Sequence, residues 1–318
     1  MTVASLADLQ ASVQDKTAFH RLEDYLIIGR RFLEFIEQAQ PTRIISPSHP
    51  HYIFYQFSEA HAHRITRPLN SHLLIHSVTD FTAAFGRFVS FLAQLRRHQQ
   101  NAADKRAHKK FIASKGINKV IYTIQQSIGS IGDSFDNVNQ ARKRAGQLFE
   151  NLVKLIIQEA GLECEPRTIN LPIPGYPGYR MPYELDLVFS RDKVIVASET
   201  RMIDTAEIVG SVKTTSKDRI DKIFLDKHLL TKLLGRDIPV AAIFLHDVQR
   251  AQKGNSIFGI ASTFKSNHFL GYTVALNKLD GVYYVDPRPE MAANERLREQ
   301  IHDFQQFLLT DLWVLSSR

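Results

Sequence analysis

The segment Glu207–Asp226 constrains the fold of this chain most strongly, because its hydrophobic pattern changes within a few residues. Ile208–Val212 is a short run of apolar, small and β-branched residues, which is typical of a buried strand. From Ile220 to Leu230 the apolar residues recur at helical spacing. Thr214–Ser216 lie between the two patterns and can cap a helix. The sequence therefore predicts a strand that turns sharply into a helix, with Lys213 at the end of the strand.

The beginning of this predicted helix is suited to binding phosphate. Lys217, Asp218 and Arg219 are expected in its first turn, where backbone N–H groups are free and the helix dipole is positive. Asp226 follows Arg219 by about two turns, so both side chains, with Lys222 between them, should lie on one side of the helix. One face of the helix is thus predicted to carry both cations and an acid.

A second acid precedes this segment. Glu184–Phe189 has the alternation of a strand and places Asp186 within it, two strands before Lys213 along the chain. A strand carboxylate and a strand lysine of this kind match the needs of a magnesium-dependent phosphodiesterase, because Mg²⁺ takes oxygen ligands and a lysine offsets charge in the transition state. A surface salt bridge between Asp186 and Lys213 is the alternative interpretation.

The rest of the pattern predicts an α/β chain with a mainly helical N-terminal region. The Gly- and Ser-rich stretch Ser127–Ser134 is the best candidate for a boundary, which gives an N-terminal region of residues 1–130 and a C-terminal domain of residues 131–318. Periodicity predicts the following helices and strands: helices up to about residue 40, then Phe81–Arg97, Asn137–Ala160 and Asn294–Val314, and strands at Lys193–Ser198, Pro239–Leu245, Gly271–Leu276 and Val282–Val285.

Basic residues suggest a polyanionic partner. The formal net charge is +7, and between Arg87 and Lys119 there are nine Lys or Arg against the single acid Asp104. A second basic cluster is Arg142–Arg144. These clusters could be solvated helix faces, or they could contact the phosphates of a nucleic acid. The residues predicted to contact DNA phosphates are Lys105, Arg106, Lys109, Lys110, Arg142 and Lys143.

Other features argue against a membrane and against a bound transition metal. No apolar run approaches the roughly 18 residues that span a bilayer, and the N-terminus lacks the features of a signal peptide. The single Cys164 agrees with a cytoplasmic location. His72 and His76 would face the same way on a helix, so a zinc site is conceivable, but no cysteine pair or HExxH motif accompanies them.

Two motifs resemble the PD-(D/E)xK type II restriction endonucleases, and within them the group containing EcoRII and PspGI. Val209–Arg219, with Asp226 beyond, resembles that group's KTTCKDR segment and its distal carboxylate. Arg142–Glu150 resembles the basic helix that precedes the active site. The likeness covers about residues 140–245. It implies a restriction-endonuclease-like core with a central mixed sheet flanked by helices, sequence-specific double-strand cleavage of DNA, Mg²⁺ as cofactor and a cognate DNA methyltransferase. Cutting both strands of a symmetric site is most simply done by a homodimer.

The chain departs from the family pattern at the acids. Asp186 is preferred to Glu184 as the first metal ligand, because the strand continues from it, and Ser211 stands where most of the family has a second acid. The resemblance assigns that second role to Asp226 and makes Glu150 a further candidate catalytic acid. Two competitors for the ligand positions are Glu199 and Glu207.

The resemblance also implies base reading by Lys217, Asp218 and Arg219. The physics agrees, since Lys and Arg donate to guanine O6 and N7 and Asp accepts from cytosine N4. A target containing a CC/GG step is therefore expected, unless Lys217 and Asp218 only cap the helix. The rival functions are a non-catalytic, sequence-specific DNA-binding protein with a nuclease-like fold and a repair or recombination nuclease of low specificity.

Overall fold

The computed structural model describes residues 4–98, 108–192 and 202–317. The chain forms two compact units, and neither of them is one continuous segment. The first unit comprises Met1–Phe91, Lys105–Leu152 and Asp247–Thr263, and the second comprises Leu92–Asp104, Val153–His246 and Phe264–Arg318. Two of the boundaries, at residues 91/92 and 152/153, fall within long helices.

The first unit is mainly helical, as the sequence predicts, and carries two small antiparallel sheets with the orders β1-β2-β3 and β8-β9 among the described residues. Its elements in chain order are α1 (Leu6–Gln14), α2 (Leu22–Ala39), β1 (Thr42–Ile45), β2 (Tyr52–Gln56), η1 (Glu59–His61), β3 (Leu69–Asn70), α3 (Val78–His98), α4 (Lys109–Ala113), α5 (Gly116–Gly132), α6 (Val138–Glu159), β8 (Val248–Lys253) and β9 (Ser256–Ser262).

Helix α5 runs through most of the Gly- and Ser-rich stretch Ser127–Ser134, which the sequence pattern predicted to be irregular. Its residues through Gly132 are helical and almost entirely buried, the polar ones included. Gly129 lets the Arg67 side chain pass close by, since a Cβ there would lie 2.3 Å from an Arg67 guanidinium nitrogen. Arg67 in turn forms a bidentate ion pair with Asp133. Small residues here serve close packing of a buried helix rather than a flexible connection.

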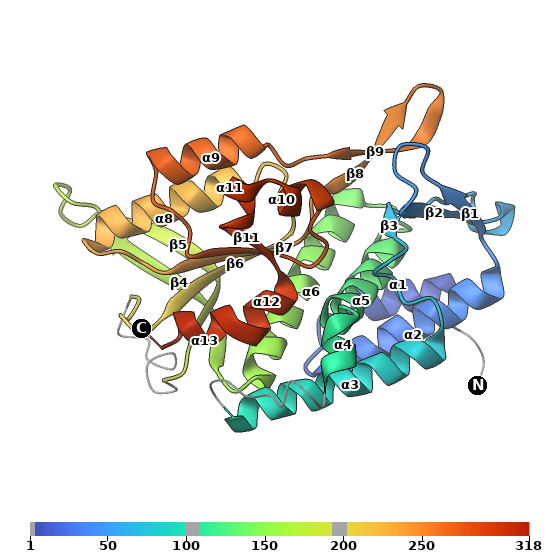
Figure 1. The fold of residues 1–318 in the computed structure, drawn as a ribbon, viewed down its shortest axis with the longest axis horizontal. Coiled ribbons are helices and arrows are strands. Elements are labelled where there is room, and N and C mark those ends of the chain that lie inside the picture. The colour runs from blue at the N-terminus through green and yellow to red at the C-terminus, as the bar shows by residue number, and fades with distance from the viewer. Residues whose placement is uncertain (1–3, 99–107, 193–201, 318) are drawn as a thin grey trace. The chain divides into compact units, whose positions relative to one another are not determined.

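The second unit is an α/β layer structure, which confirms the predicted fold class (Figure 1). Besides the ends of α3 and α6, its elements in chain order are β4 (Glu163–Pro172), β5 (Arg180–Ser190), β6 (Ile208–Thr215), α8 (Ile220–Leu234), β7 (Val240–His246), α9 (Ser266–Ala275), β10 (Gly281–Tyr284), α10 (Pro289–Ala293), α11 (Glu295–Arg298), β11 (Ile301–Asp303), α12 (Phe304–Gln306), a π-helical turn η2 (Phe307–Asp311) and α13 (Leu312–Leu315).

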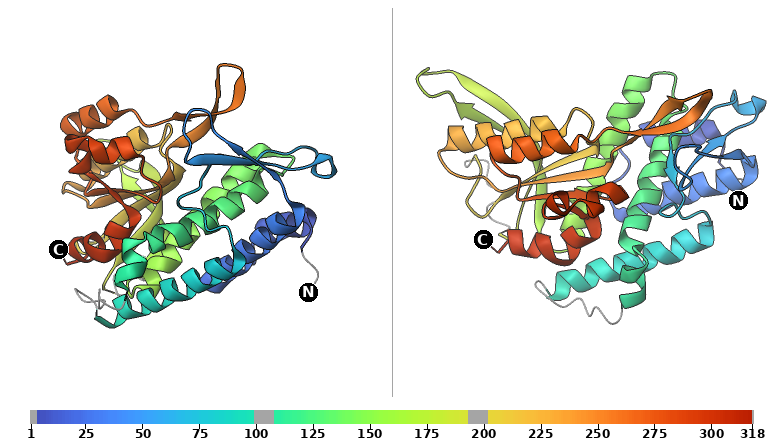
Figure 2. Two further views of the ribbon diagram at one scale, coloured as in Figure 1. Left: turned by 45° about the vertical axis from the view of Figure 1, so that its right-hand side comes forward. Right: turned by 45° about the horizontal axis from the view of Figure 1, so that its top comes forward.

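The six-stranded sheet formed by the described residues has the order β11-β10-β7-β6-β5-β4. Strands β6, β7, β10 and β11 are parallel, and β4 and β5 pair antiparallel, so the sheet is mixed. One face packs on α8 and α9 through Phe224 and Phe269, and those helices lie side by side in Figures 1 and 2. The other face packs on the C-terminal helical segment, where Phe307 contacts Phe189 and Tyr283.

Three expected elements differ from the structure. Gly271–Ala275 belong to α9, with Leu276 as its C-cap residue, and do not form a strand, because Phe269 anchors a helix on the sheet and overrides local β-propensity. Asn294–Val314 is not one helix, because Ile301–Asp303 form β11 and extend the sheet beside β10. His72 and His76 do not lie on a helix; the His76 Nδ1 atom is 3.1 Å from the Tyr55 hydroxyl. The expected strand Lys193–Ser198 lies outside the described residues.

Three expected helices are confirmed. Helix α2 ends at Ala39, before Pro41. Helices α3 and α6 match their predicted ranges to within a few residues, and Gly161 after α6 has a φ of 103°, which a glycine adopts readily. Within the ranges that the structure describes, we find no helix with the length and apolar character needed to cross a bilayer.

Candidate active site

Asp186 lies in β5 at the point where the pairing of this strand with both of its neighbours changes. On one side the β5–β6 ladder ends at the pair Leu187 and Gly210. On the other side Asp186 and Leu187 together oppose the single residue Pro166 of β4, so β5 carries a β-bulge at this point. Bulges redirect side chains and interrupt pairing beside functional sites. Asp186 therefore lies at an irregularity in the pairing of β5.

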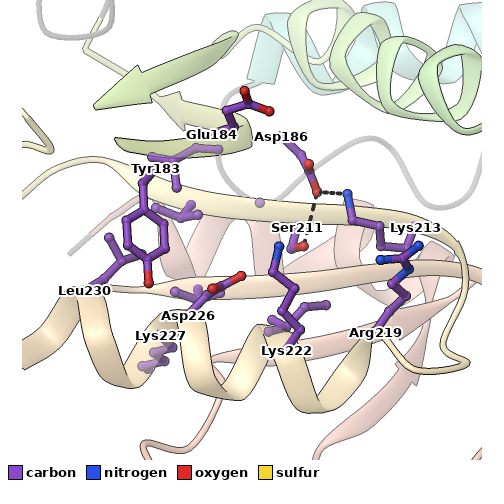
Figure 3. Close-up of a pocket in the computed structure, with 15 residues that line it drawn as sticks. Tyr183, Glu184, Asp186, Ser211, Lys213, Arg219, Lys222, Asp226, Lys227 and Leu230 are labelled. Atoms are coloured by element: carbon purple, nitrogen blue, oxygen red, sulfur yellow. Dashed lines mark hydrogen bonds and ion pairs between the residues drawn. The ribbon is translucent and has the colours of Figure 1, made fainter. Parts of the chain in front are cut away.

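The Asp186 carboxylate takes the place of the missing ladder partner. The Val212 N–H donates to Asp186 Oδ2 at 2.9 Å, and the Ser211 hydroxyl donates to the same oxygen at 3.1 Å. The Lys213 Nζ atom, from the next residue of β6, lies 2.5 Å from Asp186 Oδ2 (Figure 3). These three contacts all use Oδ2, and none of them uses Oδ1. The arrangement fixes the carboxylate while one of its oxygens stays outside these bonds.

The ion pair between Asp186 and Lys213 is only partly covered. The Lys213 and Asp186 side chains are 28% and 19% exposed, and both line a pocket between β5, β6 and α8. Solvent and a ligand can therefore reach the pair. The structure thus brings together the two residues that the sequence analysis proposed for chemistry.

Asp226 reaches the same pocket from α8 (Figure 3). Burial raises the pKa of Asp226 above its usual range, and the negative charge of Asp186 adds to the rise, whereas Lys222 and Lys213 oppose it. Burial and the charge of Asp226 likewise raise the pKa of Tyr183. Two carboxylates that repel each other across a pocket favour a cation between them.

The three residues expected to read bases lie in the turn before α8, not in its first helical turn. The helix begins at Ile220 with Arg219 as its N-cap residue, and Lys217, Asp218 and Arg219 are all exposed. Asp218 has a φ of 49°, a left-handed conformation that Asp tolerates better than most side chains. Arg219 also lines the pocket with Asp186 and Lys213. The turn therefore presents these side chains outward beside the candidate site.

The competing acids occupy different environments. Glu184 lines the pocket but is exposed, and Figure 3 shows its carboxylate directed away from Asp226. Glu207 is fully buried and forms a bidentate ion pair with Arg167, at 2.7 and 2.8 Å, and also accepts a hydrogen bond from the Asp204 N–H. Its carboxylate is committed to protein donors. Glu199 lies outside the described residues.

The remaining predicted residues lie elsewhere. Glu150 is half-buried on α6 in the first unit and does not line the pocket. Exposed side chains that agree with phosphate contact are Lys109, Lys110, Arg142 and Lys143. Lys105 and Arg106 lie outside the described residues. Arg144, which follows Arg142 and Lys143 in sequence, instead donates to the carbonyl groups of Val13 and Asp15 and has a structural role.

The donor chemistry of the pocket fits magnesium. Asp186 and Asp226 offer carboxylate oxygens, and a hard cation held by one or two carboxylates keeps several waters. Across the described ranges, no group of three or more His, Cys, Asp or Glu side chains is arranged to hold a metal. The two aspartates therefore suit an open, partly hydrated magnesium site better than a closed structural one.

Lys222 lies on the pocket-facing side of α8 together with Arg219 and Asp226, as its helical spacing predicts, although the sequence alone assigned it no role. In Figure 3 its side chain points into the pocket, and its charge acts on Asp226. The helical spacing of Arg219, Lys222 and Asp226 was the signal for this. Tyr183 also lines the pocket, and it was missed because an aromatic residue in a strand is usually a core residue.

Comparison with known proteins rests on structure alone. No protein-family model and no curated protein sequence matches the chain. The solved structure of the type IIP restriction endonuclease Kpn2I is similar, with a TM-score of 0.67 and 17% sequence identity over 98% of this chain and 96% of that one. The complex of restriction endonuclease PspGI with substrate DNA aligns with a TM-score of 0.43 and 12% identity over 63% of this chain and 81% of that one. The similarity to Kpn2I shows that the chain has the restriction-endonuclease fold.

Proposed function

We propose that this protein is a magnesium-dependent type II restriction endonuclease that makes sequence-specific double-strand cuts in DNA. The observation that carries the proposal is the Asp186–Lys213 ion pair, which shares one pocket with Asp226. The fold shared with the type IIP restriction endonuclease Kpn2I supports it. A structural salt bridge alone would not account for a second, partly buried aspartate on the opposite wall of that pocket.

In the proposed mechanism Asp186 and Asp226 would hold Mg²⁺. When bound, that ion would polarise the scissile phosphodiester and lower the pKa of an attacking water. Lys213 donates from its ammonium group to a phosphate oxygen, where negative charge grows in the transition state. Ser211 and the Val212 N–H hold the Asp186 carboxylate in place through Oδ2. Preorganisation of this kind limits the rearrangement needed during reaction.

Recognition of the target is assigned to the turn before α8. Lys217 and Arg219 would donate to guanine edges and Asp218 would accept from cytosine N4, which favours a target with CC/GG steps. Their exposure supports this role. Outside the turn, Lys109, Lys110, Arg142 and Lys143 would contact phosphates, and Lys105 and Arg106 are proposed to do the same.

The proposal extends to partners and location. Residues 1–130 would serve DNA contact or dimerisation, with residues 131–318 as the nuclease domain, and a homodimer would cut both strands of a symmetric site. Glu150 is kept as a further candidate acid near the metal. The protein would act in the cytoplasm, as part of a restriction–modification system with a cognate DNA methyltransferase.

The test is incubation of plasmid and phage DNA with the purified protein, with Mg²⁺ or with EDTA. We expect discrete fragments in Mg²⁺ and intact DNA in EDTA, with Asp186→Asn as an inactive control. Specific binding without cleavage would identify a non-catalytic DNA-binding protein. A smear of fragments whose sequenced ends share no motif would identify a nuclease of low specificity.

A further inference from the structure

The hairpin formed by β8 and β9 is firmly anchored in the first unit. Val248 and Ile260, at its base, are buried against Tyr52 and Phe54 of β2. The Ile260 N–H donates to the Ser48 hydroxyl at 2.9 Å, so the hairpin is also hydrogen-bonded to the loop between β1 and β2. These apolar contacts and this hydrogen bond at the base fix the direction in which the rest of the hairpin extends.

Asp247 fastens the two ends of the hairpin to each other. The Ser262 hydroxyl donates to Asp247 Oδ2 at 2.5 Å, and the Thr263 N–H and hydroxyl both donate to the Asp247 carbonyl oxygen at 2.8 Å. Asp247 is fully buried. The base is therefore held by backbone and side-chain bonds, whereas the turn at Gly254–Asn255 stands clear of β1 and β2 (Figure 1 and the left view of Figure 2).

The outer part of the hairpin is cationic and rich in hydrogen-bond donors. Arg250, Gln252, Lys253 and Asn255 are all exposed. The sequence contains no Asp or Glu from Val248 through Leu279. Within the described ranges, no ion pair engages Arg250 or Lys253. The positive charge here is not neutralised locally, and it is presented to solvent.

Lys253 is positioned rather than loosely attached. The strands change register between Ala251 and Lys253, and the Lys253 side chain lies across Gly259 on the opposite strand. A Cβ on Gly259 would lie 2.4 Å from Lys253 Cγ. The absence of a side chain at Gly259 thus makes room for the aliphatic stem of Lys253. A supported stem loses less conformational freedom when its ammonium group binds.

We propose that the β8–β9 hairpin is a DNA-binding ribbon that enters a groove of the duplex, with Arg250 and Lys253 on phosphates and Asn255 at the base edges. This inference rests on the proposed function. A two-stranded ribbon fits the major groove, and Asn is suited to adenine edges there. Ile257, 52% exposed near the turn, suits apolar contact with thymine methyl groups. A hairpin without acidic residues and with this donor set favours DNA over a protein partner.

The test compares the wild type with an Arg250→Ala/Lys253→Ala variant. The control, Lys16→Ala/Arg21→Ala, removes the same charge from two exposed side chains elsewhere in the first unit. Binding of plasmid restriction fragments is measured by filter retention in EDTA at several salt concentrations, and cleavage is measured in Mg²⁺. We expect about tenfold weaker binding and a salt slope smaller by about two for the hairpin variant, and changes within twofold for the control.

Asn255→Asp provides a second variant of nearly unchanged shape. We expect it to weaken binding about threefold, because it places a negative charge at the proposed groove contact, while its thermal melting matches the wild type. Wild-type binding by both hairpin variants, or an equal loss in the control, would overturn the ribbon assignment and leave wild-type cleavage in place. Failure of the wild-type protein itself to bind or cut DNA would instead contradict the proposed function.

Discussion

Two acid–cation pairs in the same sheet region differ in what their surroundings permit. Arg167 and Glu207 form a bidentate pair in which Glu207 is fully buried and accepts a further bond from a backbone N–H. Lys213 and Asp186 form a pair through one carboxylate oxygen, on the wall of a pocket that also holds Asp226. The first pair is closed by protein donors, whereas the second is open to a ligand.

The difference separates a structural role from a chemical one. A buried, fully bonded pair responds to removal of one partner with a loss of stability, because a charge is left without a partner. The partly exposed Lys213–Asp186 pair should lose less stability when Lys213 is removed, because solvent reaches the remaining charge and Ser211 and the Val212 N–H still bond the carboxylate. We therefore expect different effects of substitution at the two pairs: loss of activity at Lys213–Asp186 and loss of stability at Arg167–Glu207.

The largest effect is expected at Lys213. Lys213→Ala should lower the rate of cleavage about a thousandfold, because the ammonium group acts on transition-state charge, while specific DNA binding and the free energy of unfolding change by less than about 1 kcal/mol. Single-turnover cleavage, filter binding and urea unfolding measure the three quantities. Equal losses of binding and cleavage would make Lys213 a phosphate anchor instead.

At the closed pair, Arg167→Ala should lower the free energy of unfolding by about 3 kcal/mol, with the cleavage rate per folded molecule unchanged. Urea unfolding and active-site titration measure the two effects. The matched control is Arg167→Met/Glu207→Met, which we expect to be less destabilised than Arg167→Ala, because it removes both charges. A double variant as unstable as the single one would contradict the stranded charge as the cause.

Arg219→Ala should cost about 1–3 kcal/mol of discrimination at one G·C pair of the target. Lys109→Ala, the comparison variant, should weaken binding to all sequences about equally and reduce the salt slope by about one. Competition binding with duplexes altered at each position of the mapped site measures both. Uniform weakening by Arg219→Ala would remove its base-reading role.

The smallest effect is expected at Lys222, whose charge acts on Asp226 from the same helix face. Lys222→Ala should slow cleavage about tenfold, because one of the cations facing the scissile phosphate is lost, and Lys222→Arg should restore most of the rate. Cleavage kinetics at saturating Mg²⁺ provide the measurement. An unchanged rate in Lys222→Ala would confine Lys222 to the surface of α8.

Local sequence patterns predicted strand β6 and the helix α8 that follows it well. The change from strand to helical periodicity around Lys213, and the two-turn spacing from Arg219 to Asp226, depend only on neighbouring residues. The pattern also predicted α2, α3 and α6. The start of α8 was misplaced by three residues, because Asp218 adopts a left-handed conformation that propensity alone does not reveal.

Long-range contacts explain what the sequence could not reveal. The structural role of Glu207 depends on its ion pair with Arg167, which lies 40 residues earlier in the chain. The Gly- and Ser-rich end of α5 packs against Arg67, which lies more than sixty residues earlier in the chain and pairs with Asp133. The irregular pairing at Asp186 depends on the register between β5 and β4. In each case tertiary packing, and not local propensity, decided the outcome.

The measurement that tests the central claim most directly is a crystal structure of the protein with target DNA and Ca²⁺, an ion that occupies magnesium sites with oxygen ligands. We predict one oxygen of Asp186 and one of Asp226 within about 2.3–2.6 Å of the ion, or bonded to a water that touches it, with Lys213 Nζ beside the scissile phosphate. Asp226 turned to solvent, with Glu199 or Glu207 coordinating the ion in its place, would contradict the account.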